Sequence, residues 1–148
     1  MVSINHIINF IIMSFKLITP KNTRDVRSVG RTAIATTAGV LYFNSITTGA
    51  LQIAGAATTA NQTLYLANET LTSASTPFSA TVCSKEDEYL VDVDNNSNAA
   101  HNGQRMILNA SGASLTNTGT DVSGTTGVFV QLAVVGASTD KKILARRV

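Results

Sequence analysis

The chain has 148 residues and a net charge of +2, with 44% hydrophobic and 14% charged residues. This length suits one domain with its own core, and so few charges leave a surface of Thr, Ser and Asn that costs little to desolvate and suits assembly contacts. The single cysteine, Cys83, excludes an internal disulfide. Within the run SATVC it is expected to be a small buried hydrophobe rather than a nucleophile.

Residues 1–12 differ from the rest of the chain. The apolar run INHIINFII is about half the length needed to span a bilayer, and no cation precedes it as in a signal peptide. We therefore expect no membrane anchor. Its isoleucines follow helical spacing, which leaves open a helix docked on a partner. The interpretation we favour is that residues 1–12 lie upstream of a natural start at Met13.

Residues 13–31 are predicted to form an extended basic arm. The segment has one proline, little apolar periodicity and several cations after Phe15. Such an arm can reach a neighbouring subunit and place its cations on carboxylate or phosphate groups. A solvated or locally paired basic segment is the alternative. Nucleic-acid binding is not expected, because no aromatic residues interleave with the cations.

Residues 32–148 alternate short runs of Val, Leu, Ile, Thr and Tyr with clusters of Gly, Asn, Ser and Thr. The predicted strands are residues 32–36, 40–43, 50–54, 63–67, 78–83, 88–93, 104–110, 113–117, 127–135 and 141–147. About ten short strands with hairpin-length connections indicate an all-β domain, either a small barrel or a sandwich. The expected core residues are Val40, Tyr42, Leu51, Ile53, Leu64, Leu66, Val82, Leu90, Val91, Val93, Met106, Leu108, Phe129, Leu132 and Val134.

Charge is distributed unevenly along the chain. Residues 1–40 carry a net +4, residues 41–100 a net −5 and residues 101–148 a net +3. Basic ends around an acidic middle permit complementary contacts between subunits, because opposite potentials steer encounter and fix register. Scattered, solvated charge is the alternative.

An alternating set of oxygen-bearing side chains in DVDNNSN has the spacing of the start of an EF-hand loop. The set consists of Asp92, Asp94, Asn96 and Asn98. The glycine expected at the sixth position is Ser97, and the glutamate expected at the twelfth is Gly103. We therefore expect an Asx-rich turn after a strand, with no metal ion or other cofactor bound.

Catalytic candidates are few. His101 lies in the turn AAHNG, and no nucleophile elbow, zinc-binding pair or phosphate loop accompanies it. The adjacent acids Glu86, Asp87 and Glu88 could supply paired carboxylates for glycoside hydrolysis. A solvated acidic lip is the preferred interpretation, because the chain has no Trp to form a sugar platform. The sequence predicts a protein that is not an enzyme.

Three stretches carry a resemblance to a known class of protein. They are GVLYFNSITTGALQIAGAATTANQT, EYLVDVDNNSNAAHNGQRMILNASGASLTNTGTD and VFVQLAVVGASTDKKILARRV. The chain from about residue 37 to 148 resembles the small β proteins that decorate or cement the heads of tailed phages. The resemblance implies a non-enzymatic virion protein, made in the host cytoplasm, that binds the major capsid protein on the outside of an icosahedral shell, often as a homotrimer.

Taken with this resemblance, the basic segments at both ends are expected to contact the capsid or a partner subunit. The expected contact residues are Phe15, Lys16, Lys21, Arg24, Arg27, Arg31, Lys141, Lys142, Arg146 and Arg147. Residues 15–31 would act as the arm, and residues 141–148 would pair with a partner strand. The alternative function is a carbohydrate-binding or adhesin-like β module of a phage fibre or cell surface.

Overall fold

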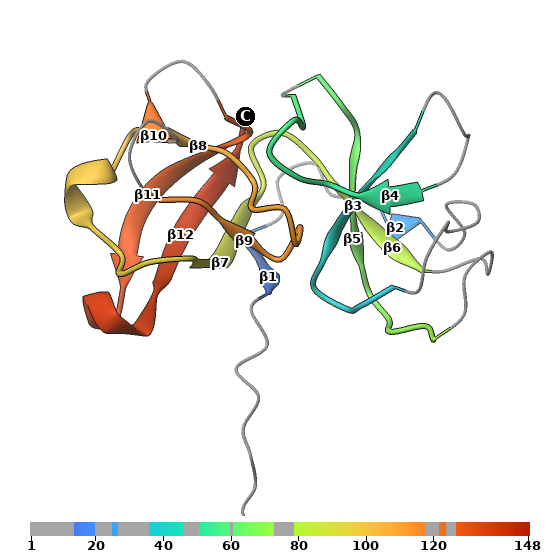
Figure 1. Cartoon of the computed structure of the whole chain (residues 1–148), viewed down its shortest axis with the longest axis horizontal. Helices are drawn as coiled ribbons and strands as arrows, with labels where there is room; N and C mark the ends of the chain where they lie inside the picture. The colour runs from blue at the N-terminus through green and yellow to red at the C-terminus, as the bar shows by residue number, and fades with distance from the viewer. Residues whose placement is uncertain are drawn as a thin grey trace, which may run out of the picture.

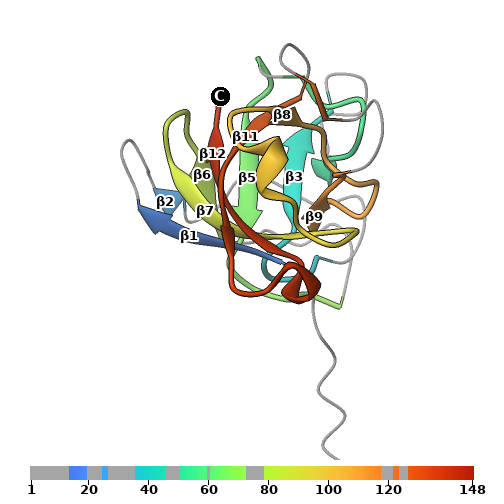
Figure 2. The same ribbon diagram turned by 90° about the vertical axis from the view of Figure 1, so that its left-hand side faces the viewer.

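Two β-sheets make up almost all of the regular structure in the computed structural model. It describes residues 14–19, 25–26, 36–45, 51–59, 61–72, 79–117, 122–123 and 127–148. Within them, one sheet has seven strands and the other has five. Figure 1 shows the two sheets side by side, and the perpendicular view in Figure 2 shows one sheet lying over the other. The arrangement is a β-sandwich, which confirms the predicted all-β class.

The strand order in each sheet differs from the order in the chain. The seven-stranded sheet runs β1 (Phe15–Thr19), β7 (Glu88–Val93), β12 (Lys142–Arg147), β11 (Phe129–Val135), β8 (Arg105–Met106) and β10 (Val122–Ser123), and β9 (Ser114–Leu115) pairs with the end of β7. The five-stranded sheet runs β2 (Asp25–Val26), β6 (Ala80–Cys83), β5 (Leu64–Ala67), β3 (Leu41–Asn44) and β4 (Leu51–Ile53). All pairs are antiparallel except β7 with β9. Two short 3-10 helices, η1 (Ala99–His101) and η3 (Ser138–Asp140), lie in connections.

Alternation along the strands explains why these residues form a sandwich. In β12, Ile143, Ala145 and Arg147 are buried and the residues between them are half-buried. Successive side chains of a strand point to opposite faces, so one face of β12 packs inward and the other faces out. The inner faces of both sheets supply one continuous cluster that includes Leu41, Leu64, Tyr89, Val91 and Phe129.

A second apolar cluster lies on the other side of the five-stranded sheet. Tyr42 and Leu51 are each 1% exposed there and pack with Val40, Ala67 and Ala80. The five-stranded sheet therefore buries apolar side chains on both faces, and its alternation is less visible in the sequence.

The predicted core is confirmed at ten positions. These are Val40, Tyr42, Leu51, Leu64, Leu66, Val91, Val93, Met106, Leu108 and Phe129. The other five are half-buried: Ile53, Val82, Leu90, Leu132 and Val134. Leu90 and Leu132 belong to runs of apolar residues in which the sequence does not show which face is inside.

The predicted arm is wrong over Phe15–Thr19, which form strand β1. Phe15 pairs with Val91 and its side chain is 3% exposed. Its ring packs against those of Phe129, at 5.1 Å between centroids, and Tyr89, at 6.3 Å. Burial of an aromatic ring in the core fixes this segment to its own domain. Residues 1–12 and the start at Met13 lie outside the described residues.

The C-terminal segment was expected to pair with a partner strand, and this is also wrong. Strand β12 pairs with β11 along one edge and with β7 along the other. Both sets of backbone donors and acceptors are used within the chain, so β12 has no edge to offer a second molecule.

Candidate functional site

The outward side of the seven-stranded sheet is the candidate contact surface. Its outward residues follow from the register, because Leu144 alternates with the buried Ile143 and Ala145. We define the outer face by its large aliphatic residues: Ile18, Leu90, Val130, Val135 and Leu144. Among the described residues, Ile18 (47%) and Val135 (37%) are the two exposed large hydrophobic side chains, and both lie on this face.

Charged residues surround these aliphatic side chains. Lys16 is exposed on β1, and Arg105 is half-buried opposite Val130. Lys142 and Arg146 lie on β12, on the same side as Leu144. Glu88 adds an anion, and Asp92 is 3% exposed and paired with Lys142. Positive charge therefore predominates on the outer face.

The predicted contact residues near the C-terminus make bonds within the chain. The Lys142 ammonium lies 2.6 Å from Asp92 Oδ1, and the Arg146 guanidinium lies 3.6 Å from Glu86 Oε2. Lys141 Nζ donates to the backbone carbonyl of Asp94 at 3.3 Å. Lys16, Lys142 and Arg146 all lie on the outer face, whereas Lys141 lies beside η3.

Two of the predicted contact residues are inside the molecule. Phe15 belongs to the core, and Arg147 is 2% exposed. A buried side chain cannot touch a partner, so both assignments are corrected. Lys21, Arg24, Arg27 and Arg31 lie outside the described residues.

The buried Arg147 guanidinium ties the two sheets together. It donates to the carbonyls of Val128 (2.9 Å) and Val148 (2.6 Å), and to that of Gln62 (3.0 Å) in the connection before β5. It also lies 5.9 Å from the centre of the Phe129 ring. Burial lowers the pKa of Arg147 from its usual value. Sequence reasoning missed this role because nothing in KKILARR distinguishes Arg147 from Arg146.

Cys83 behaves as the sequence predicts, as a buried apolar residue. Burial raises the pKa of its thiol from 9.0 to about 12, and the nearby Tyr89 and Arg147 oppose that rise only in part. Burial also raises the pKa of Tyr89 above its usual range. The thiolate, which is the reactive form of cysteine, is therefore disfavoured at this site.

The polar side chains at the end of β7 and in the following turn accept hydrogen bonds from backbone N–H groups. Asp94 Oδ1 accepts from the backbone N–H of Asn117 at 3.1 Å, and Asn98 Oδ1 accepts from that of Ala100 at 2.9 Å. Asp92 Oδ2 accepts from the N–H of Ser14 at 2.9 Å. Over the described residues, no group of three or more His, Cys, Asp and Glu side chains is placed to hold a metal ion. Asn98 caps η1, whereas Asp92 and Asp94 tie β7 to segments that are distant in the sequence.

The catalytic candidates do not gather around one cleft. Asp87 is buried, whereas Glu86 is exposed with φ 71° and faces Arg146. His101 ends η1, which is held to β11 by the Gln131 amide through 2.8 Å bonds to the Asn98 carbonyl and Asn102 Oδ1. Gln131 is fully buried, and sequence reasoning missed its role because it lies within an apolar run.

Comparison with known proteins gives no relative from which to assign a role. No protein-family model, curated protein or solved structure matches the chain. None of the helices in the described parts of the chain is long and apolar enough to cross a membrane.

Proposed function

We propose that this protein is a non-enzymatic virion protein that decorates or cements an icosahedral phage capsid. The resemblance of residues 37–148 to head-decoration proteins gives the class of partner, and the outer face supports attachment through contacts. On this proposal the major capsid protein covers the outer face, and copies of the chain associate as a homotrimer on the shell.

The outer face is the observation on which the proposal rests. Large aliphatic side chains on an exposed sheet face are costly unless a partner removes them from water. Ile18 and Val135 are the most exposed of them, at opposite edges of the β1, β7, β12 and β11 layer. A partner that covers both must also cover the half-buried Leu90 and Leu144 between them.

The charged residues on the outer face indicate what kind of partner surface would complement it. Lys16, Arg105 and Arg146 surround the aliphatic residues, and the opposing charges are Glu88 and Glu86, which faces Arg146. A complementary surface is apolar at its centre and acidic at its rim, since matched potentials steer encounter and fix register. Weak contacts of this kind add up when they repeat over a closed lattice.

Co-sedimentation with shells assembled from the major capsid protein tests this proposal. The variant Ile18→Glu/Val135→Glu puts two carboxylates on the outer face, and Thr59→Glu/Thr63→Glu makes the same charge change at exposed positions in the connection between β4 and β5. We expect the first variant to bind at least about tenfold more weakly, equivalent to about 1.4 kcal/mol, and the second to bind as the wild type does. Equal binding of all three proteins would overturn the proposal.

A further outcome concerns contacts between copies. If Ile18→Glu/Val135→Glu breaks up the wild-type oligomer and leaves shell binding unchanged, the outer face is an interface between copies. That result would contradict its assignment to the capsid protein.

A further inference from the structure

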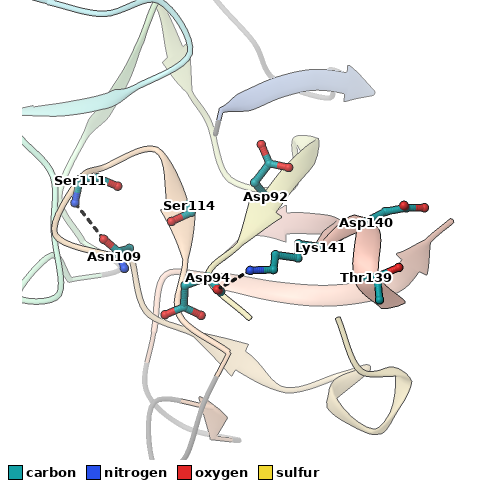
Figure 3. A pocket seen from close by; sticks show the side chains of 8 residues that line it. All are labelled: Asp92, Asp94, Asn109, Ser111, Ser114, Thr139, Asp140 and Lys141. Atoms are coloured by element: carbon teal, nitrogen blue, oxygen red, sulfur yellow. Dashed lines mark hydrogen bonds between the residues drawn. The ribbon is translucent and has the colours of Figure 1, made fainter. Parts of the chain in front are cut away.

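A polar pocket of about 530 Å³ lies at the end of β7 (Figure 3). Asn109, Ser111 and Ser114 line it from one side, and Thr139 and Asp140 line it from η3 on the other. The Lys141 side chain reaches between the two sides toward the Asp94 carbonyl. Pockets of this volume accommodate small organic ligands.

Ser114 is the clearest sign that the pocket takes a ligand. It is 1% exposed, and Cα pairing places it beside the buried Asp92. Its hydroxyl lines the pocket and makes no hydrogen bond within the described residues. The oxygen is not fully enclosed by the protein, so a ligand in the pocket can hydrogen-bond to it.

The carboxylates of Asp94 and Asp140 can each accept further hydrogen bonds. Asp94 uses Oδ1 to accept from Asn117 N–H, and Asp140 uses Oδ2 to accept from Ala137 N–H at 2.8 Å. The second oxygen of each carboxylate accepts no hydrogen bond from the described part of the chain. Each carboxylate can therefore accept from a ligand while its structural bond stays in place.

Donors lie among these acceptors. Asn109 Oδ1 accepts from Ser111 N–H at 3.1 Å, which leaves its amide protons for other partners, and the hydroxyls of Ser111 and Thr139 can donate. Lys141 supplies an ammonium group. The lining therefore offers both donors and acceptors along two walls.

This mixture distinguishes between classes of ligand. A metal ion needs converging oxygen ligands, and the described carboxylates do not converge. An anion would meet Asp92, Asp94 and Asp140, and a basic side chain would meet the Lys141 ammonium. Every hydroxyl of a sugar both donates and accepts, which matches a lining of carboxylate, amide and hydroxyl groups.

We infer that the pocket between β9 and η3 binds a neutral saccharide, with Ser114, Asp94 and Asp140 hydrogen-bonding its hydroxyls. This inference goes beyond shell attachment and agrees with the carbohydrate-binding alternative that the sequence left open. None of the described residues that line the pocket has an aromatic ring, so recognition by these residues rests on hydrogen bonds and is weak for a single site.

A glycan array that carries neutral, sialylated and sulfated oligosaccharides tests the ligand class with the full chain. We expect neutral glycans alone to bind. Titration of the strongest neutral glycan, followed by amide NMR, is then expected to shift signals from residues 109–114 and 138–141. Binding to acidic glycans only, or shifts elsewhere on the molecule, would overturn the inference.

Two conservative variants locate the site. Ser114→Ala and Thr139→Val each remove a hydroxyl, and Thr63→Val makes the same change at an exposed site in the connection before β5. We expect the first two variants to bind about tenfold more weakly than the wild type, equivalent to about 1.4 kcal/mol. The third variant is expected to bind as the wild type does. If no neutral glycan binds, or if a lysine-rich peptide or calcium chloride alone shifts the pocket signals, the inference fails. Shell binding by Ser114→Ala is measured in parallel, so loss of one function is distinguishable from loss of the other.

Discussion

At the scale of single residues, buried polar side chains hold particular elements of this sandwich together. Arg147 reaches carbonyls just before β11 and β5, one strand from each sheet, and Gln131 holds η1 to β11. Each satisfies groups that would otherwise be costly to bury. A sequence pattern cannot identify such residues, because Arg147 follows an identical residue and Gln131 stands among aliphatic neighbours.

Replacing Arg147 tests its role in joining the sheets. Arg147→Met keeps much of the side-chain volume and removes the donors to Val128 and Gln62, so we expect unfolding free energy to fall by about 2–4 kcal/mol. Arg146→Met is the matched control, since Arg146 is 39% exposed and faces Glu86 at 3.6 Å. The free energy of unfolding of Arg146→Met is expected to fall by less than about 1 kcal/mol in denaturant titrations. Equal losses would show that Arg147 does not join the sheets.

The Cys83 thiol is expected to resist labelling in the folded protein at neutral pH. Its pKa of about 12 and its burial keep it protonated and inaccessible. A thiol reagent added with and without guanidinium chloride measures this, and rapid labelling of the native chain would contradict it.

The raised pKa of Cys83 also makes the free energy of unfolding depend on pH. Because the folded-state pKa lies above the usual 9.0, the contribution of Cys83 to stability is complete below pH 9.0 and is lost as pH rises toward about 12. Cys83→Ala is expected to show a shallower loss of stability across that window, measured by denaturation at a series of pH values. An unchanged slope would refute the assignment.

Gly127 is expected to tolerate no side chain. Its φ is 104°, and an added Cβ would lie 2.6 Å from Met106 C and 2.8 Å from Met106 N. Gly103 has a similar φ of 83°, with nothing within 4 Å of an added Cβ. Gly127→Ala should therefore lose about 1–3 kcal/mol more than Gly103→Ala in denaturant titrations. Equal losses of unfolding free energy in the two variants would mean that the positive φ, and not contact with Met106, determines the cost at Gly127.

At the scale of elements, the sequence predicts the long strands and misses those defined by distant partners. β7, β11 and β12 carry long β-branched and aliphatic runs, so their positions are visible locally. β1 pairs with β7, more than 70 residues away, and its FKLIT run is followed by a proline and cations. Its pairing therefore has no local signal.

The candidate surface was also only partly visible in the sequence. Leu90 and Leu132 were expected in the core. Pairing with Leu144 places Leu90 on the outer face, whereas Leu132 has no partner in the pairing of β11 with β12. A register shift between Gln131 and Ala133 changes the alternation in β11. Lys142 and Arg146 were recognised as contact candidates from charge alone, whereas Arg147 was indistinguishable from them.

The start of β1 is expected to depend on Asp92. Its carboxylate accepts from Ser14 N–H at 2.9 Å and pairs with Lys142 at 2.6 Å. Asp92→Asn removes the charge from this arrangement, so amides of Phe15–Thr19 should exchange hydrogen faster while those of Leu64–Ala67 stay unchanged. Asp140→Asn, which alters an exposed carboxylate, is the control. Unchanged exchange in β1 would exclude this role.

At the scale of the whole molecule, the sandwich separates two surfaces with different chemistry. The outer face is aliphatic with a basic rim and fits a protein partner, whereas the pocket between β9 and η3 is polar and fits a small ligand. On our two proposals, the chain attaches to the shell through the outer face and binds a saccharide in the pocket. Fold alone does not assign either role, so both depend on the residues of the site.

An image of the assembled particle tests the central claim most directly. A cryo-EM map of shells saturated with the protein should show the outer face of the seven-stranded sheet, with Ile18, Leu144 and Val135, against the major capsid protein. Three copies should meet at each local threefold axis. A map in which the five-stranded sheet faces the shell, or in which saturated shells carry no added density, would contradict the account.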